Sequence, residues 1–263
     1  MAIEFRQKPG LVVYLTIGDP DLSTSKKIAL AAIDAGADVL ELGVPFSDPL
    51  ADGPVIQRAS QRAVRNGTRL VDVLSLAKEL RRERPHAGLV IFSYLNPILR
   101  MGLEAFAKTA EMAGVDGVLV TDMIAEESRE YRAVLRKHNL QPVFLAAPTS
   151  SDARLQRVAD VSEGFIYAIS RVGITGTQHQ LAGDARDLVT RLRRYTTLPI
   201  ALGFGISNAE HIAAVAEFAD AAVVGSAIVA LIEQSTSEQA PGAVGKFIAG
   251  LRAPASVQEN VAY

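Results

Sequence analysis

The sequence predicts a single-domain (β/α)8 barrel that spans residues 1–263. Eight short apolar runs rich in β-branched residues recur along the chain, and segments with helical periodicity separate them. Several of these runs are apolar at every position, as strands of a parallel sheet buried on both faces require. Barrels of this kind commonly reach roughly this length as one domain. An open doubly wound sheet is the alternative arrangement of the same elements.

The expected strands follow one another at intervals that leave room for at least one helix. They are Leu11 to Thr16, Val39 to Leu42, Leu89 to Ser93, Gly117 to Val120, Pro142 to Leu145, Gly164 to Ile169, Pro199 to Leu202 and Ala221 to Val224. Between them, apolar residues fall at i, i+3, i+4 and i+7, for example at Ile28, Ala31, Ala32 and Ala35. This spacing predicts helices that pack one face on the sheet. Residues 253–263 are expected to form a flexible C-terminal tail.

The composition indicates a folded, cytoplasmic protein and excludes several kinds of partner. A net charge of −2 at pH 7 provides no general attraction for nucleic acid or for an anionic membrane surface. The chain has no cysteine, which excludes disulfides, thiolate metal sites and cysteine nucleophiles. No apolar run approaches the roughly 18 residues of a membrane span. We therefore expect neither nucleic acid nor a membrane as a partner.

The longest interval between expected strands follows the second one and begins with the segment Glu41 to Pro54. Alternation along the second strand directs Val39 and Glu41 into the barrel near its upper rim. A buried carboxyl group without a basic partner has a raised pKa, as a general acid requires. No Lys or Arg lies between Val39 and Leu50 to pair with it. Glu41 is therefore a candidate catalytic residue, and a structural ion pair with a base elsewhere in the chain is the alternative.

Asp52 lies in the same loop, directly before Gly53 and Pro54. Two carboxylates with different burial can divide acid and base duties, which makes Asp52 the second catalytic candidate. The alternative is a helix N-cap, because Asp suits that position and proline suits the first turn. Metal binding is a rival use of the pair, but no His accompanies them and the four His residues of the chain are scattered.

Two glycine-containing turns follow the seventh and eighth expected strands, Gly203 to Glu210 and Gly225 to Ile228. Each leads from a strand directly into a helix, whose free N–H groups and dipole hold an anion without Lys or Arg. Barrels commonly bind phosphate after these two strands. The alternative is that the glycines only permit tight turns and that Ser207 and Glu210 form a capping box. Together the two turns predict a phosphate site.

A polar segment with glycines, Ser170 to Gln178, follows the sixth expected strand. Such a loop can close over a substrate and exclude water, and an ordinary surface connection is the alternative. On the strand before it, Tyr167 is in phase with Phe165 and Ile169, so its hydroxyl could face the two carboxylates. The alternative is a core aromatic residue whose hydroxyl finds another partner.

Four segments taken together resemble the α subunit family of tryptophan synthase. They are Glu41 to Pro54, Ser170 to Gly176, Gly203 to Ser207 and Gly225 to Ile228. Further agreement comes from Thr16 to Pro20, from Tyr94 to Pro97 and from Asp122 with Glu126 and Glu127. The resemblance spans nearly the whole chain, and its first segment is close to unique to that family among phosphate-binding barrels.

The resemblance implies a carbon–carbon lyase of tryptophan biosynthesis, which splits indole-3-glycerol phosphate into indole and glyceraldehyde 3-phosphate by a retro-aldol reaction. It implies that Glu41 moves protons between indole C3 and the glycerol hydroxyl, that Asp52 holds the indole N–H, and that Tyr167 orients Asp52. The implied phosphate site comprises backbone groups of Gly176, Phe204, Gly205, Gly225 and Ser226, with Thr175 as a substrate-binding residue in the closing loop. Candidates for the indole pocket are Tyr14, Leu50, Ile56 and Phe204.

The family's α subunit needs no cofactor of its own and docks on a β subunit that carries pyridoxal phosphate. The implied partner is therefore a β chain in an αββα heterotetramer, which receives indole from the α subunit and contacts the loops after strands two and three. The amino terminus before Leu11 is short, which leaves open how the barrel floor is closed. Asp122 to Ala125 lacks the prolines often found after that Asp. The alternatives are another phosphosugar-processing barrel enzyme and a mainly regulatory subunit that activates a β partner.

Overall fold

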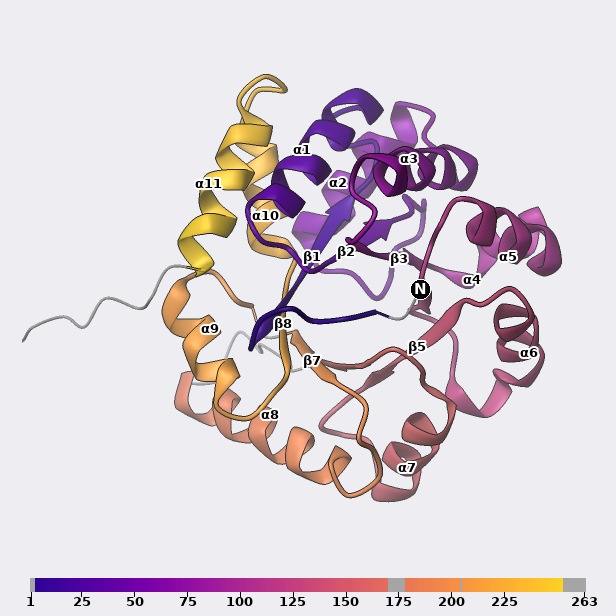
Figure 1. Ribbon diagram of the computed structural model, residues 1–263, viewed down its shortest axis with the longest axis vertical. Coiled ribbons are helices and arrows are strands. Elements are labelled where there is room, and N and C mark those ends of the chain that lie inside the picture. Colours follow the sequence, from indigo (N-terminus) through magenta and orange to yellow (C-terminus); the bar gives the residue numbers. More distant parts are fainter. Residues whose placement is uncertain (1–2, 170–177, 204, 253–263) are drawn as a thin grey trace, which may run out of the picture.

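The computed structural model describes residues 3–169, 178–203 and 205–252, and its strands form one closed parallel barrel ringed by helices (Figure 1). The strands pair in chain order from β1 to β8, and β8 pairs back to β1. They are β1 Gly10–Thr16, β2 Val39–Gly43, β3 Gly88–Ser93, β4 Gly117–Val120, β5 Gln141–Ala146, β6 Ile166–Ile169, β7 Ile200–Gly203 and β8 Ala221–Val224. The predicted barrel is thus confirmed over the open doubly wound alternative.

Helices follow each strand, and several connections carry two of them. They are α1 Leu22–Asp34, α2 Pro54–Arg65, α3 Leu70–Glu83, α4 Leu95–Met101, α5 Leu103–Met112, α6 Arg129–Lys137, α7 Asp152–Val161, α8 Gln178–Leu192, α9 Ala209–Ala216, α10 Ser226–Glu233 and α11 Ala240–Arg252, with a 3-10 turn at Ala125–Glu127. Helix α2 is the extra element of the long interval after β2, and it packs against α10 and β1. None of the helices in the described ranges is both long and apolar enough to cross a membrane.

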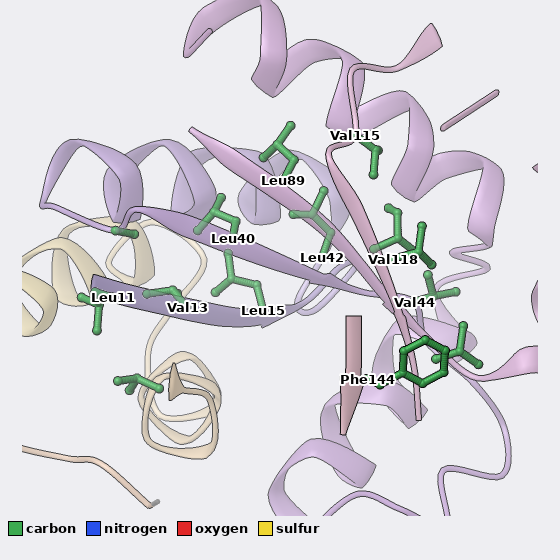
Figure 2. Close-up of a cluster of buried hydrophobic side chains, with 14 of the residues drawn as sticks. Leu11, Val13, Leu15, Leu40, Leu42, Val44, Leu89, Val115, Val118 and Phe144 are labelled. Atoms are coloured by element: carbon green, nitrogen blue, oxygen red, sulfur yellow. The ribbon is translucent and has the colours of Figure 1, made fainter. Parts of the chain in front are cut away.

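Alternation along the strands separates two apolar layers. Figure 2 shows the layer between strands and helices, in which Leu11, Val13 and Leu15 of β1 lie beside Leu40 and Leu42 of β2. The intervening positions fill the inside of the barrel with a second cluster. Its buried members are Ile3, Val12, Val39, Val90, Leu119, Val143, Phe165, Ala201, Ala221 and Val223. Seven strands contribute buried members to this inner cluster, and Tyr167 of β6 packs against it, so the barrel interior is a packed core.

The strand register places Glu41 inside the barrel. Val12 lies beside Val39 and Tyr14 beside Glu41 in the parallel pairing of β1 with β2. Because Val39 belongs to the inner cluster, Glu41, two residues further along β2, points inward one layer nearer the carboxyl ends of the strands. The predicted orientation of Glu41 is confirmed.

The amino-terminal segment closes the floor of the barrel without a helix. The side chain of Ile3 is buried within the inner cluster, and Phe5 packs against the same cluster. The rings of Phe5 and Phe165 meet edge to face with their centroids 6.0 Å apart. A short non-helical segment is therefore sufficient to close the barrel floor, a point that the sequence alone did not predict.

Aspartates at the floor repeat one arrangement. Asp38 precedes β2 and accepts a hydrogen bond at 2.8 Å from the backbone N–H of Leu11 in β1, while Arg252 lies 2.6 Å from the same oxygen. Asp116, which precedes β4, accepts a hydrogen bond from a backbone N–H of β3 and pairs with an arginine. Asp220, which precedes β8, does the same with a backbone N–H of β7 and another arginine. Each carboxylate thus joins the start of the preceding strand to a basic side chain.

Candidate active site

A cavity of about 430 Å³ lies at the carboxyl ends of the strands. Its lining comes from loops and strand ends on both halves of the barrel, including Tyr14, Asp52, Tyr167, Gly225 and Ser226. This is the face at which barrel enzymes carry their active sites. The cavity brings together residues that are far apart in the sequence and that the motifs had singled out separately.

Glu41 lies at the base of this site and is fully buried. Its side chain is 0% exposed, and among the described residues neither carboxyl oxygen has a hydrogen-bond partner. Burial raises the pKa of Glu41 from an ordinary value of 4.5 to about 8. The alternative of a structural ion pair is therefore wrong within the described part of the chain. At neutral pH the group holds a proton that it can donate.

The hydroxyl of Tyr14 lies on the mouth side of Glu41. A side chain at Gly43, which faces the same way as Glu41, would come within 2.4 Å of the Tyr14 oxygen. Glycine at this strand position therefore makes room for the tyrosine. Thr16 donates a hydrogen bond to the Tyr14 hydroxyl at 3.3 Å, and burial raises the pKa of that hydroxyl well above its usual range. The predicted contribution of Tyr14 to the cavity wall agrees with its position.

Asp52 lines the cavity just before α2 begins. The N-cap of α2 is Gly53, and no side chain caps the helix, so the helix-cap alternative for Asp52 is wrong. The Tyr94 hydroxyl donates a hydrogen bond to Asp52 at 3.0 Å and accepts one from the Ala51 N–H at 2.9 Å. Burial raises the pKa of Asp52 from 3.8 to about 6, against the lowering effect of the Tyr94 bond. Near neutral pH Asp52 is ionised while Glu41 is protonated, so the two carboxyls differ as expected.

The tyrosine that holds Asp52 differs from the expected one. Tyr94, at the start of α4, makes this hydrogen bond, and Tyr167 makes none to Asp52 in the structure, so the expectation for Tyr167 is corrected. The Tyr94 ring also stacks on Phe46 of the same loop, with centroids 5.1 Å apart. Only the family resemblance indicated the segment Tyr94 to Pro97, because spacing in the sequence does not show that this segment contacts the loop after β2.

Tyr167 lines the cavity and faces both carboxyl groups. Burial is the main cause of its strongly raised pKa, and the neighbouring charges of Glu41 and Asp52 add to it. A side chain at Gly203 would come within 2.8 Å of the Tyr167 hydroxyl, so glycine on β7 makes room for it. Tyr167 therefore points into the cavity as predicted, but the predicted hydrogen bond from its hydroxyl to Asp52 is not present.

Another part of the cavity wall consists of glycines and a helix start. Gly205 has a φ of 55°, a left-handed conformation that favours glycine. Helix α10 begins at Ser226 with Gly225 as its N-cap and no side-chain cap, so its first N–H groups are free to bind an anion. Gly205, Gly225 and Ser226 all line the cavity, as predicted. At the nearby α9, Asn208 caps the helix by accepting from His211 N–H, so a Ser207 and Glu210 capping box is not what holds this turn.

Three predicted ligands, Thr175, Gly176 and Phe204, lie outside the described residues. The predicted closing loop, Ser170 to Gln178, falls there as well except for its last residue, and so does the predicted tail at residues 253–263.

The apolar wall of the cavity differs in part from the expected one. Ile56 lines it as predicted, but the Leu50 side chain is 90% exposed and lies away from it. Phe92 and Leu145, which had not been predicted, also line the cavity. Phe92 meets Tyr14 edge to face with centroids 5.0 Å apart. Both residues lie at inward-facing positions near the ends of β3 and β5. Alternation along these strands could have predicted them.

The cavity wall therefore holds Asp52, aromatic rings and a helix N-terminus, and the fully buried Glu41 lies beside Tyr14 of that wall. A family model described as tryptophan synthase alpha chain matches residues 2–251, nearly the whole chain. The chain belongs to the tryptophan synthase alpha chain family. The resemblance seen in the sequence is thereby confirmed.

Relatives and solved structures agree with this membership. The tryptophan synthase alpha chain of Solibacter usitatus is 47% identical over 233 residues, which cover 89% of this chain and 87% of the relative. That of Cupriavidus taiwanensis is 44% identical over 95% of each chain. Tryptophan synthase subunit alpha from Legionella pneumophila superposes with a TM-score of 0.85 at 33% identity, covering 93% of this chain and 91% of that one. A chain of the tryptophan synthase complex from Pyrococcus furiosus gives 0.85 at 36% identity, covering 94% and 98%.

Proposed function

We propose that this chain cleaves indole-3-glycerol phosphate to indole and glyceraldehyde 3-phosphate, the retro-aldol lyase reaction of its family. The observation that carries the proposal is the layout of one cavity. Asp52, ionised near neutral pH, and the free N-terminus of α10 line this cavity, and the buried, protonated Glu41 lies beside Tyr14 of its wall. A ligand with an indole ring joined to a phosphate by three carbons matches this layout in its chemistry.

Glu41 acts as both acid and base in the proposed reaction. Its proton is transferred to indole C3, which converts the ring to the 3H-indolium cation, with the positive charge on the ring nitrogen. The carboxylate so formed removes the proton from the hydroxyl on the adjacent glycerol carbon, and the electron pair of that O–H bond forms the aldehyde carbonyl. The bond from C3 to the glycerol carbon breaks, and its electrons restore the neutral indole. Glu41 ends protonated, ready for another cycle.

Asp52 stabilises the charge that develops on the ring nitrogen. Its pKa of about 6 keeps it ionised at neutral pH, and the Tyr94 hydroxyl holds one of its oxygens in place. A fixed negative charge in a largely dry site lowers the energy of the cationic tautomer more than it would in water. Asp52 therefore favours the same step that Glu41 begins.

The phosphate binds at the glycine end of the cavity. Gly225 and Ser226 bring the first N–H groups of α10 to the cavity surface, where the helix dipole favours an anion. A side chain at Gly225 would lie 3.3 Å from Cβ of Tyr14, a tight contact, so glycine suits this turn. In the proposed function Thr175, Gly176, Phe204 and Gly205 complete this site.

The proposed assembly is the αββα heterotetramer, in which the β subunit carries pyridoxal phosphate and takes up the indole. The chain itself uses no cofactor in this scheme and works in the cytoplasm. The likeness to a chain of the Pyrococcus furiosus tryptophan synthase complex supports the choice of partner. The proposed contact surface is the loop after β2, with the exposed Leu50, and the segment after β3, with the exposed Leu99 of α4.

The test is an assay for indole released from indole-3-glycerol phosphate by the isolated chain and by the chain with a β subunit. Indole and glyceraldehyde 3-phosphate in equal amounts are expected in both cases. Phosphosugars without an indole ring serve as the control substrates. Turnover of those substrates without indole release would identify a different phosphosugar enzyme, and release only with the β subunit would identify a mainly regulatory chain.

A further inference from the structure

Helix α2 carries the aromatic end of the site. Asp52 precedes it by two residues, and the Gln57 side chain donates a hydrogen bond to the backbone carbonyl of Asp52 at 2.9 Å. Ile56 of the same helix lines the cavity. The position of Asp52 therefore depends on the position of α2.

Helix α10 carries the phosphate end. It begins at Ser226 in the cavity wall and ends at Glu233. The two helices touch along an apolar seam in which Ala59 of α2 and Val229 of α10 share one buried cluster with Tyr14. Apolar contacts hold the helices together, and because they are non-directional they specify the relative position of the helices less strictly than a bidentate ion pair does.

A charged junction fixes the two helices beside that seam. Glu233 accepts hydrogen bonds from both nitrogens of the Arg58 fork, at 2.9 and 2.7 Å, and from Arg62 at 2.6 Å. Both arginines belong to α2. The bonds from Arg58, and then those from Arg62, lower the pKa of Glu233 to about 2, so it is ionised at any working pH.

Arg62 also anchors the junction to the barrel. Its Nε and Nη2 bind the two oxygens of Asp19, each at 2.8 Å. Asp19 lies in the loop after β1 and is only 3% exposed, so its charge is shielded from water and depends on Arg62. The same loop accepts hydrogen bonds from the Asn66 side chain at the end of α2. One guanidinium group thus joins the β1 loop, α2 and α10 through all three of its nitrogens.

We propose that Arg62 is a positioning residue that fixes the distance between the two ends of the site, and so selects ligands that span both. The inference rests on the proposed function, because it requires a ligand with a ring at one end and a phosphate at the other. Such a ligand binds well only when both ends are held at the separation that its chain dictates. A ligand that occupies one end alone does not sense that separation.

The test measures binding of three probes to the folded chain. Indole joined to phosphate by a three-carbon chain without hydroxyl groups spans the site and cannot be cleaved. Inorganic phosphate and indole each occupy one end. In Arg62→Lys a positive charge remains beside Asp19, but one ammonium group cannot reproduce the bidentate contact and also reach Glu233. The spanning probe is expected to bind roughly tenfold more weakly, since misplacement of about 1 Å has effects up to ~100-fold. Phosphate and indole should change by less than about twofold.

A matched control is available at the other end of the barrel. Arg84 makes the same bidentate contact with Asp34, at 2.6 and 2.7 Å, far from the cavity lining. Arg84→Lys should leave all three affinities unchanged. If Arg62→Lys does not fold, Glu233→Gln provides the same test, because it weakens the link to α10 and keeps the Asp19 pair.

The outcomes separate the two proposals. Selective weakening of the spanning probe supports the positioning role of Arg62. Equal weakening of all probes, or of phosphate alone, or no change at all, overturns it while the wild-type chain still binds the spanning probe. Failure of the wild-type chain to bind that probe overturns the proposed function, and this inference with it.

Discussion

The floor and the mouth of the barrel both hold buried carboxyl groups, but their surroundings differ. At the floor, Asp38 and Asp116 each pair with an arginine and with a backbone N–H of a neighbouring strand. At the mouth, Glu41 has no hydrogen-bond partner among the described residues, and the only side chain that donates to Asp52 there is Tyr94. Ion-paired carboxylates join parts of the chain, whereas desolvated carboxyl groups without an ion pair have raised pKa values and can exchange protons. The comparison indicates that ion pairs stabilise the floor and also hold Asp19 of the β1 loop through Arg62, while Glu41 and Asp52 at the mouth have no ion pair among the described residues.

The largest expected effect is on activity at the mouth. Glu41→Gln keeps the shape of the side chain but cannot give and regain a proton, so kcat for indole release should fall by roughly 10² to 10⁴ or more. Steady-state kinetics measure this, and Glu79→Gln in the surface pair with Lys26 is the matched control. Unchanged turnover in Glu41→Gln would remove Glu41 from the reaction.

The same substitution should change how stability depends on pH. Between 4.5 and about 8 the folded chain keeps a proton on Glu41 that the unfolded chain has lost. Unfolding then releases a proton, so the free energy of unfolding falls as pH rises through this window, by several kcal/mol. Glu41→Gln removes this contribution.

Urea unfolding of both proteins from pH 5 to 8 tests the point. The advantage of Glu41→Gln over the wild-type chain should grow with pH, because all other titrating groups are shared. If the free energy of unfolding depends on pH in the same way for both proteins, the pKa of Glu41 is ordinary in the folded state. Glu41 would then not differ from the paired carboxylates of the floor.

At the floor, Asp38→Asn should lower stability and leave the chemistry intact. It weakens a buried pair with Arg252, so the free energy of unfolding is expected to fall by roughly 3 kcal/mol. Asp34→Asn, in an exposed pair with Arg84, should cost about 1 kcal/mol or less. Denaturant unfolding and kcat are measured for both. A large loss of kcat in folded Asp38→Asn would contradict the separation of roles.

The smallest expected effect is on the acidic side of the pH profile. Tyr94→Phe removes the hydrogen bond that lowers the pKa of Asp52, so that pKa should rise above about 6. The acidic limb of kcat/KM should move to higher pH, with modest loss of activity above pH 8. Tyr131→Phe, at a buried tyrosine that bonds to the Val118 carbonyl in the outer layer, is the control. An acidic limb that stays in place would show that Tyr94 does not act through Asp52.

Much of the fold could be predicted because its signals are local. Apolar runs marked the eight strands, and the spacing of residues such as Ile28 and Ala32 marked helices that pack on them. The inward direction of Glu41 followed from alternation along one strand. The helix start at Ser226 followed from the glycine before it.

Other features depend on residues that meet only in the folded chain. Tyr94 and Asp52 are 42 positions apart, and spacing does not show that the β3 loop covers the β2 loop. Leu50 was expected in the indole pocket because it is apolar and close to Asp52, yet its side chain faces solvent. The closure of the floor by Ile3 and Phe5 also lay outside what local patterns reveal.

The sequence by itself determined the barrel, the face that carries the site and the two carboxyl groups, because hydrophobic period and glycine placement act over a few residues. The tertiary structure decided which of the carboxyl groups are paired. Glu41 has a raised pKa because it is buried and, among the described residues, its carboxyl group has no hydrogen-bond partner, whereas Asp38 is held in an ion pair because Arg252, 214 positions away, reaches it. Burial and pairing are properties of the assembled chain, and they set the pKa values on which the proposed chemistry depends.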